Sequence, residues 1–130
     1  MSKEFVPYEL AVKLKELGFD EPCLGYYSNV EFVFGNHTNN VMQRFRYSAP
    51  TIAEVVMWLY EKHDIYINVI PDLSSRHNLI DRKFYVSMFK YSMNINLQVE
   101  ILKEDKNILY FNKLENAYEF GILHALKNLI

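Results

Sequence analysis

The side chains best suited to chemistry in this sequence are aromatic rings that can stack and arginines that can hold an anion. A guanidinium group forms paired hydrogen bonds with phosphate oxygens, and an aromatic ring offers a flat apolar surface to a nucleobase. Together, these two residue types suit a small anionic ligand such as a nucleotide. The candidate ligand-binding residues are Tyr26, Tyr27, Arg44, Arg46, Trp58, Arg76 and Arg82.

Two of the candidates, Tyr26 and Tyr27, lie in a segment rich in turn-forming residues. The segment reads D-E-P-C-L-G-Y-Y-S-N at 20–29, and its Pro22 and Gly25 predict a loop. Binding residues are often carried on loops that a rigid scaffold positions, so this is the first candidate for a functional loop.

Arg44 and Arg46 fall in the second of two strands that the alternation of apolar side chains predicts over 30–34 and 41–47. The polar tip G-N-H-T-N-N between them makes this a predicted β-hairpin. Because side chains alternate across a strand, the two arginines should share one face. That face is either an anion-binding surface or an ordinary solvated sheet face, since arginine is mostly exposed.

Arg76 and Arg82 belong to the most basic segment of the chain, D-L-S-S-R-H-N-L-I-D-R-K at 72–83. The segment follows a short β-branched strand that Pro71 ends. Such a segment either binds an anion or is a solvated connection between strands.

Trp58, the single tryptophan, lies on a predicted helix that begins near Ile52. Thr51 and Glu54 have the spacing of a capping box, in which each residue satisfies a free backbone donor of the other. Trp58 falls on the charged side of this helix, and an indole there needs a covering surface. Either another part of the chain covers it, or Trp58 walls a ligand pocket or an interface. The core-facing stripe consists of Ile52, Val55, Val56 and Leu59.

The remaining pattern predicts two more helices and four more strands. A first helix over 8–17 ends at Gly18, and a last helix begins after Asn112, whose spacing to Glu115 is typical of an N-cap. The order is α-β-β-α-β-β-β-β-α, which predicts one α+β domain over residues 1–130 with a mainly antiparallel sheet of about five to six strands. The further strands are predicted at 65–70, 84–91, 95–101 and 108–111.

Composition argues against several classes of function. Fourteen Lys and Arg against sixteen Asp and Glu give a formal net charge of −2, so no global field attracts nucleic acid. The chain has no apolar run of membrane-spanning length and no signal-peptide pattern, which predicts a cytoplasmic protein with no membrane partner.

Catalytic and metal-binding patterns are equally weak. The four histidines lie far apart without metal-ligand spacing, and Cys23 is the only cysteine, which argues against a metal, another cofactor or an internal disulfide. Cys23 is best interpreted as a small apolar residue, and His63 as a positive charge at a helix C-terminus. We therefore expect a protein that is not an enzyme.

Two stretches of the chain carry a resemblance to a known family. The first is F-V-P-Y-E-L-A-V-K-L-K-E-L-G-F-D-E-P-C-L-G-Y-Y at 5–27, and the second is S-A-P-T followed by E-V-V-M-W-L-Y-E-K-H within 48–63. Together they resemble a family of small uncharacterised proteins encoded by phages and prophages of Bacteroidota. The last helix of that family often opens Y-E-E-A, and L-E-N-A at 114–117 departs from it at two positions. The resemblance implies a phage accessory protein in a bacterial host and carries no assigned activity.

Two non-enzymatic functions fit this pattern. In the first, the protein sequesters a small anionic host ligand, such as a nucleotide immune signal, and so acts against host defence. In the second, it inhibits or redirects a host protein through an apolar patch with aromatic and arginine anchors. A homo-oligomer that shares a pocket between copies fits the first function well.

Overall fold

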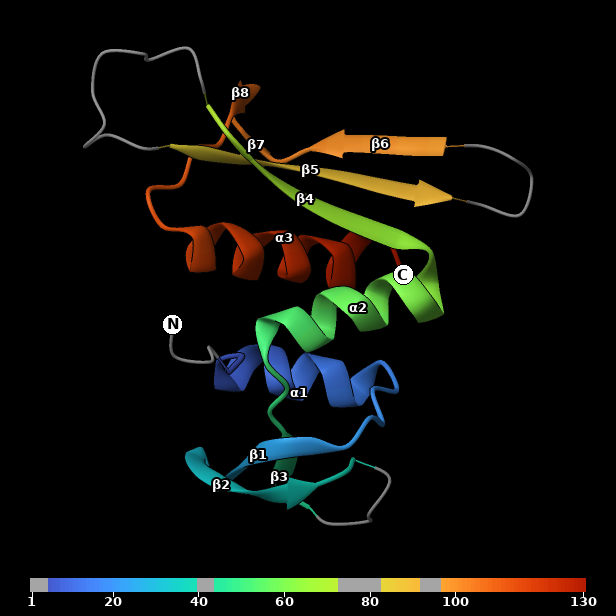
Figure 1. Ribbon diagram of the computed structural model, residues 1–130, viewed down its shortest axis with the longest axis vertical. Helices are drawn as coiled ribbons and strands as arrows, with labels where there is room; N and C mark the ends of the chain where they lie inside the picture. The colour runs from blue at the N-terminus through green and yellow to red at the C-terminus, as the bar shows by residue number, and fades with distance from the viewer. Residues whose placement is uncertain (1–4, 40–43, 73–82, 92–96) are drawn as a thin grey trace. The chain divides into compact units, whose positions relative to one another are not determined.

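The computed structural model describes residues 5–39, 44–72, 83–91 and 97–130. The chain divides into two compact units, Met1–Val55 and Val56–Ile130, and each unit is described by itself (Figure 1). No helix in the described part of the chain is long and apolar enough to cross a membrane.

The first unit contains helix α1 (Tyr8–Glu16) and a three-stranded antiparallel sheet in the order β2-β1-β3. The helix ends as the sequence predicts: Gly18 has a φ of 90°, and the Phe19 N–H donates to the Leu14 carbonyl at 2.9 Å. This left-handed glycine satisfies carbonyl groups that the last turn leaves free. The strands are β1 (Cys23–Ser28), β2 (Glu31–His37) and β3 (Arg46–Ser48).

Helix α1 covers one face of this sheet. Tyr27 and Tyr47 are register partners on β1 and β3, and both rings lie edge-on to Tyr8 of α1, with centroids at 5.6 and 5.7 Å. Because side chains alternate along a strand, Tyr26 points to the other face. The two neighbouring tyrosines are therefore on opposite faces of the sheet.

Helix α2 (Ile52–His63) begins in the first unit and ends in the second. The predicted capping box is confirmed, since the Thr51 N–H donates to Glu54 Oε1 at 3.0 Å and the Glu54 N–H donates to Thr51 Oγ1 at 3.2 Å. Asp64, with a φ of 55°, follows the helix and turns the chain into the next strand.

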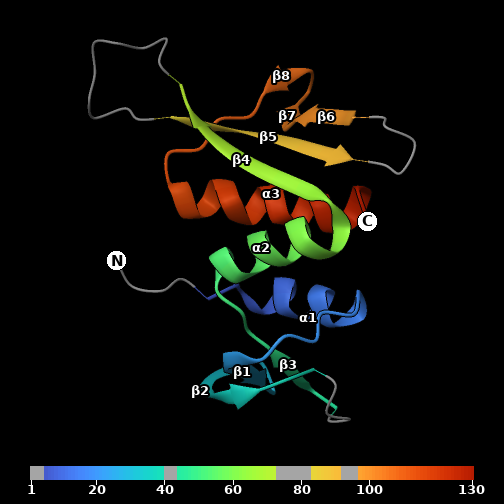
Figure 2. The same ribbon diagram turned by 45° about the vertical axis from the view of Figure 1, so that its right-hand side comes forward.

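The second unit holds an antiparallel sheet in the order β4-β5-β6, a small β7-β8 hairpin and helix α3. Figures 1 and 2 both show α3 along one face of the β4-β5-β6 sheet. The elements are β4 (Ile65–Pro71), β5 (Phe84–Tyr91), β6 (Leu97–Ile101), β7 (Lys103–Glu104), β8 (Asn107–Ile108) and α3 (Leu114–Asn128).

A glycine brings α3 close to this sheet. A Cβ atom added to Gly121 would lie 2.9 Å from Val86 Cγ1 and 3.2 Å from Ile67 Cγ2, which is closer than ordinary van der Waals contact. Val86 and Ile67 are buried, as are Ala117 and Ala125 of the helix. Small residues on α3 thus let the β-branched side chains of β4 and β5 pack directly against the helix backbone.

The α+β class, the three helices and the antiparallel pairing agree with the sequence prediction, but the strand pairing differs from it. Among the described residues the strands form two three-stranded sheets and one two-stranded hairpin, where we expected one larger sheet. The last helix begins at Leu114, and its N-cap is Lys113. The prediction that Asn112 is the N-cap is therefore wrong. The prediction of a single domain over 1–130 stays a prediction.

The segment expected to be a loop around Tyr26 and Tyr27 is strand β1, and it pairs with β2 in place of the predicted 30–34 and 41–47 hairpin. Gly25 lies inside strand β1. A glycine suits this position because the ring of Phe32 fills the space that a side chain would need: an added Cβ would lie 2.6 Å from Phe32 Cζ. A glycine that marks a close approach was thus mistaken for a loop signal.

Candidate functional site

Tyr26 is the one predicted site residue that the structure surrounds with other candidate binding groups. Its ring stacks on His37 of β2, with centroids 4.9 Å apart and planes 21° from parallel. The guanidinium carbon of Arg46 on β3 lies 5.6 Å from the centroid of the same ring, within cation–π range. We call Tyr26, His37, Arg46 and Ser48 the Tyr26 cluster.

His37 is the electrostatically unusual member of the Tyr26 cluster. Its Nδ1 lies 2.7 Å from the hydroxyl oxygen of Ser48, whereas its Nε2 is buried and has no hydrogen-bond partner. Burial lowers the pKa of His37 first, and the positive charges of Lys15 and Arg46 lower it further. The imidazole is therefore held in its neutral form, and the two fixed cations near it supply a local positive charge.

Tyr27 has a structural role. Its hydroxyl donates to the Val6 carbonyl at 2.7 Å, and its ring contacts Tyr8 of α1 and Phe32 of β2. These contacts fix the strand against the helix. Tyr27 therefore does not join Tyr26 in one binding surface, because strand alternation separates them.

Arg44 and Arg46 do not lie on one strand. Arg44 is in a turn, Phe45 has a φ of 64°, and β3 begins only at Arg46. A left-handed residue between the two arginines breaks the extended backbone on which alternation depends, so the prediction that they share a strand face is wrong. Of the two, only Arg46 belongs to the Tyr26 cluster; Lys15 Nζ also donates to the Arg46 carbonyl at 3.0 Å.

Trp58 belongs to the second unit and is buried, with 5% of its surface exposed. Its ring lies edge-on to His63 at 4.7 Å. Burial and the charge of Lys90 lower the pKa of His63, while Asp64 opposes this shift. Two interpretations of Trp58 were open: an indole covered by the chain itself, or a wall of a ligand pocket or interface. The structure favours the first.

Arg76 and Arg82 lie outside the described residues, so the predicted basic loop adds nothing to a described site. The seven predicted residues therefore do not form a single described constellation. Tyr26 and Arg46 come together, Tyr27 and Trp58 have packing roles, and Arg44 lies exposed in a turn.

Besides Ser48, whose hydroxyl lies beside His37, Cys23 is a described residue near the Tyr26 cluster with the chemistry of a nucleophile. It is 2% exposed, and its Sγ lies 3.4 Å from the Glu21 carbonyl that accepts from it. Burial, with the nearby charge of Glu54, raises the pKa of the thiol to about 12. At neutral pH the thiolate is therefore rare, and a thiol is a weak nucleophile. Within the described residues, no group of three or more His, Cys, Asp or Glu could hold a metal ion.

A second candidate surface, which the sequence analysis missed, is the face of the β4-β5-β6 sheet that points away from α3. Since Ile67 and Val86 meet Gly121 of α3, alternation assigns their neighbours Tyr66, Tyr85 and others to the opposite side. Figures 1 and 2 show no helix of the second unit on that side. We call this the open face; its apolar members are Tyr66, Ile70, Tyr85, Phe89, Val99 and Ile101.

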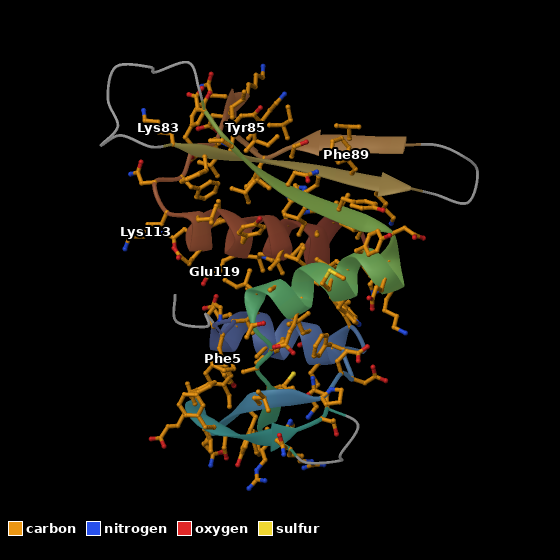
Figure 3. The ribbon with its side chains drawn as sticks, viewed as in Figure 1. Phe5, Lys83, Tyr85, Phe89, Lys113 and Glu119 are labelled. Atoms are coloured by element: carbon orange, nitrogen blue, oxygen red, sulfur yellow. The ribbon has the colours of Figure 1, made fainter. Side chains whose placement is uncertain are left out.

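The open face is aromatic and partly solvent-exposed. Tyr66, Val99 and Ile101 are 37%, 50% and 38% exposed, and Tyr85 and Phe89, labelled in Figure 3, are partly buried on β5 between them. Further tyrosines extend it at both ends: Tyr60 lies 4.7 Å from Tyr66, and Tyr110 lies 6.4 Å from Tyr85, between ring centroids. None of the described residues at the open-face register positions of β4, β5 and β6 is charged.

Comparison with known proteins finds no matching family model, no matching curated protein and no matching solved structure. The function must therefore be inferred from the chemistry and geometry of these two surfaces.

Proposed function

We propose that this chain is a non-enzymatic binding protein that recognises another protein through the open face. The observation that carries the proposal is the contrast between the two sides of the β4-β5-β6 sheet. One side is closed by α3, while the other presents apolar and aromatic side chains that no described helix of the unit covers. Asn68 and Ser87 form a polar register pair between the Tyr66/Phe89 and Ile70/Tyr85 pairs, so the apolar side chains make two clusters beside it. Exposed apolar clusters bordered by polar residues are typical of a protein interaction site.

The composition of the open face supports a protein partner over a charged ligand. Interface cores are depleted in charged residues and enriched in aromatic ones, and Tyr is among the residues that contribute most binding energy. Tyr85 offers a large ring with one hydroxyl that can meet a hydrogen-bond partner at the rim, and Tyr66 offers a second large ring. The partner surface that fits is itself apolar, with polar groups at its edge for this hydroxyl.

The resemblance to phage-encoded proteins suggests where such a partner would be found. In the cytoplasm of an infected or lysogenic bacterial host, a small phage accessory protein that binds through one face would inhibit or redirect a host protein. An anti-defence role is one form of this function.

The test is a binding measurement with matched variants. The tagged protein captures its partner from a host extract, and the affinity of the purified pair is then measured by calorimetry. We expect Tyr66→Ala and Phe89→Ala each to weaken binding by about tenfold or more, because buried aromatic anchors carry most of the binding energy. Phe34→Ala is the control, since Phe34 is 77% exposed in the first unit. Binding that survives both open-face substitutions would refute the proposal.

The Tyr26 cluster favours a second candidate function, the sequestration of a small anionic ligand. Arg46 lies over the Tyr26 ring, and Lys15 and Arg46 add positive charge beside the neutral His37. Phosphate on the Arg46 guanidinium would use this positive charge. A homo-oligomer would not be needed for this binding mode.

A thermal-shift screen of nucleotides, cyclic dinucleotides and ADP-ribose derivatives tests this second function. A ligand at about 100 times its Kd stabilises the folded state by about 2.7 kcal/mol, a clear rise in the melting temperature. Arg46→Ala should abolish the shift, and Arg44→Ala, in the neighbouring turn, should leave it unchanged. A shift that persists in Arg46→Ala would place the ligand elsewhere.

A further inference from the structure

Strand β6 (Leu97–Ile101) lies at the edge of its sheet. Among the described residues it pairs in the sheet with β5 alone, so one side of its backbone has no described strand beside it. An edge strand of this kind presents unpaired N–H and C=O groups that can pair with another chain.

The register shows which backbone groups of β6 point outward. The Leu102 N–H donates to the Val86 carbonyl at 3.0 Å, and the same register pairs Ile101 with Ser87 and Val99 with Phe89. In an antiparallel ladder, directly hydrogen-bonded pairs alternate with pairs whose N–H and C=O groups point away from each other. Leu97, Val99 and Ile101 therefore direct their backbone donors and acceptors away from β5.

Strand β6 contains no lysine or proline, and Glu100 is its one charged residue. Natural edge strands are protected by lysine, proline or a bulge. Val99 and Ile101 are instead apolar and exposed, at 50% and 38%, and the register between β5 and β6 has no shift. The other edge strand, β4, ends in Pro71. Of the two edges of this sheet, β6 is the one suited to pairing.

We propose that β6 pairs antiparallel with β6 of a second copy of this chain, about a two-fold axis at Val99. The strand reads L-Q-V-E-I, which is apolar at both ends and at its centre, so its pattern is the same in either direction. Pairing Val99 with Val99 of the partner subunit pairs Leu97 with Ile101 of the partner subunit. The three outward residues of each copy then form about six hydrogen bonds, and no two like charges lie directly opposite.

This self-pairing joins two three-stranded sheets into one continuous sheet. The open faces of the two copies then lie on the same side of that sheet, because directly opposite residues of an antiparallel pair project to the same face. The inference goes beyond the proposed function because it uses the backbone edge of β6. Val99 and Ile101 belong to both surfaces, but the variants that test partner recognition, Tyr66→Ala and Phe89→Ala, alter β4 and β5 and leave this edge intact.

Sedimentation of the full chain at about 5 µM to about 500 µM provides the first test. We expect a reversible monomer–dimer equilibrium. Val99→Pro should weaken it by at least about tenfold, because proline removes an outward N–H that the monomer sheet does not use. Val99→Thr, which keeps the N–H and a β-branched side chain, is the matched control and should dimerise like the wild type. Circular dichroism establishes that both variants are folded.

Disulfide trapping provides the second test and does not depend on proline. Val99→Cys places two thiols across the axis at a Cα separation of about 5.5 Å, which a disulfide can span. Oxidation should give a covalent dimer, while the exposed Glu104→Cys control on β7 should not. The native Cys23 is buried and should not compete.

A wild-type chain that stays monomeric over the whole concentration range would overturn the inference. So would a dimer that Val99→Pro leaves intact, because the contact would then lie on another surface. If Val99→Pro, but not Val99→Thr, weakens the binding of a different protein to a monomeric chain, the edge pairs with a strand of that partner and the assignment to a second copy is wrong.

Discussion

Replacing Gly121 with alanine tests how tightly α3 closes one face of the β4-β5-β6 sheet. The closure matters for the proposed function because it leaves the opposite face as the surface that we propose for a partner. The added methyl group would lie 2.9 Å from Val86 Cγ1 and 3.2 Å from Ile67 Cγ2. Carbon atoms in favourable contact are about 3.5–4.0 Å apart, so both contacts are too close.

Two opposing effects set the magnitude. Alanine in a helix interior is favoured over glycine by about 1 kcal/mol. Extra atoms in a packed core cost about 1–3 kcal/mol, and the upper half of that range applies here, because Val86 and Ile67 are 0% and 6% exposed and have β-branched, stiff side chains. We therefore expect Gly121→Ala to lower the free energy of unfolding by about 1–2 kcal/mol.

Urea denaturation followed by circular dichroism measures this change directly. The unfolding entropy near 60 °C is about 2.1 cal/mol/K per residue, so for 130 residues each kcal/mol lowers the melting temperature by about 4 °C. The expected drop in melting temperature is then about 4–7 °C.

A double-mutant cycle with Val86→Ala is the control. Removing the Val86 methyl groups opens the space that the new methyl needs, so Gly121→Ala should be neutral or stabilising in the Val86→Ala background. The reasoning is refuted if Gly121→Ala stabilises the otherwise native chain by about 1 kcal/mol and its effect is the same in both backgrounds. That result would mean that the helix and the sheet are not in close contact at Gly121.

Three further predictions concern the first unit. The pKa of His37 is lowered on folding, so the unfolded chain binds more protons and the free energy of unfolding falls as the pH drops below about 6.5. Urea titrations at pH 7 and pH 5 should show a smaller loss of stability in His37→Gln than in the wild type. An unchanged loss would exclude His37 as its source. The Cys23 thiol is buried, and its pKa is raised to about 12. It should therefore react with a thiol reagent at pH 8 only as fast as the chain opens. Fast labelling of the folded protein would contradict its burial. Thr51→Ala should lower the free energy of unfolding by about 1 kcal/mol, because α2 loses its N-terminal cap. Thr51→Ser keeps the hydroxyl and is the control. Equal stability of the two variants would show that the cap contributes nothing.

Features that depend on neighbouring residues in the sequence were predicted well. The capping box of α2 needs only Thr51 and Glu54 three positions apart, and the end of α1 needs only Gly18 and the apolar residue after it. Both are local backbone arrangements, so the chain around them carries the whole signal.

Features that depend on distant residues were predicted poorly. The β1-β2 turn has Asn29 and Val30 at positive φ, 49° and 74°, and valine is rarely found in that conformation, so the pair did not signal a hairpin. Gly25 suggested a loop, and only the ring of Phe32 on the next strand shows why a glycine is needed there. For the same reason, the contact between Tyr26 and His37 depends on a strand pairing that local patterns do not reveal.

The open face shows a different limit, because its signal was present in the sequence but was not used to predict a surface. Strand β5 reads F-Y-V-S-M-F-K-Y, with apolar residues at both sets of alternating positions. An antiparallel strand with one face in water normally alternates apolar and polar residues, whereas a strand covered on both sides does not. Among the described residues α3 covers the side that includes Val86, and no described helix of the unit covers the side that includes Tyr85 and Phe89. Packing against α3 explains only the first set of apolar side chains. The second set suits a partner surface better than it suits water, and for that reason we propose that this face of the sheet recognises a partner.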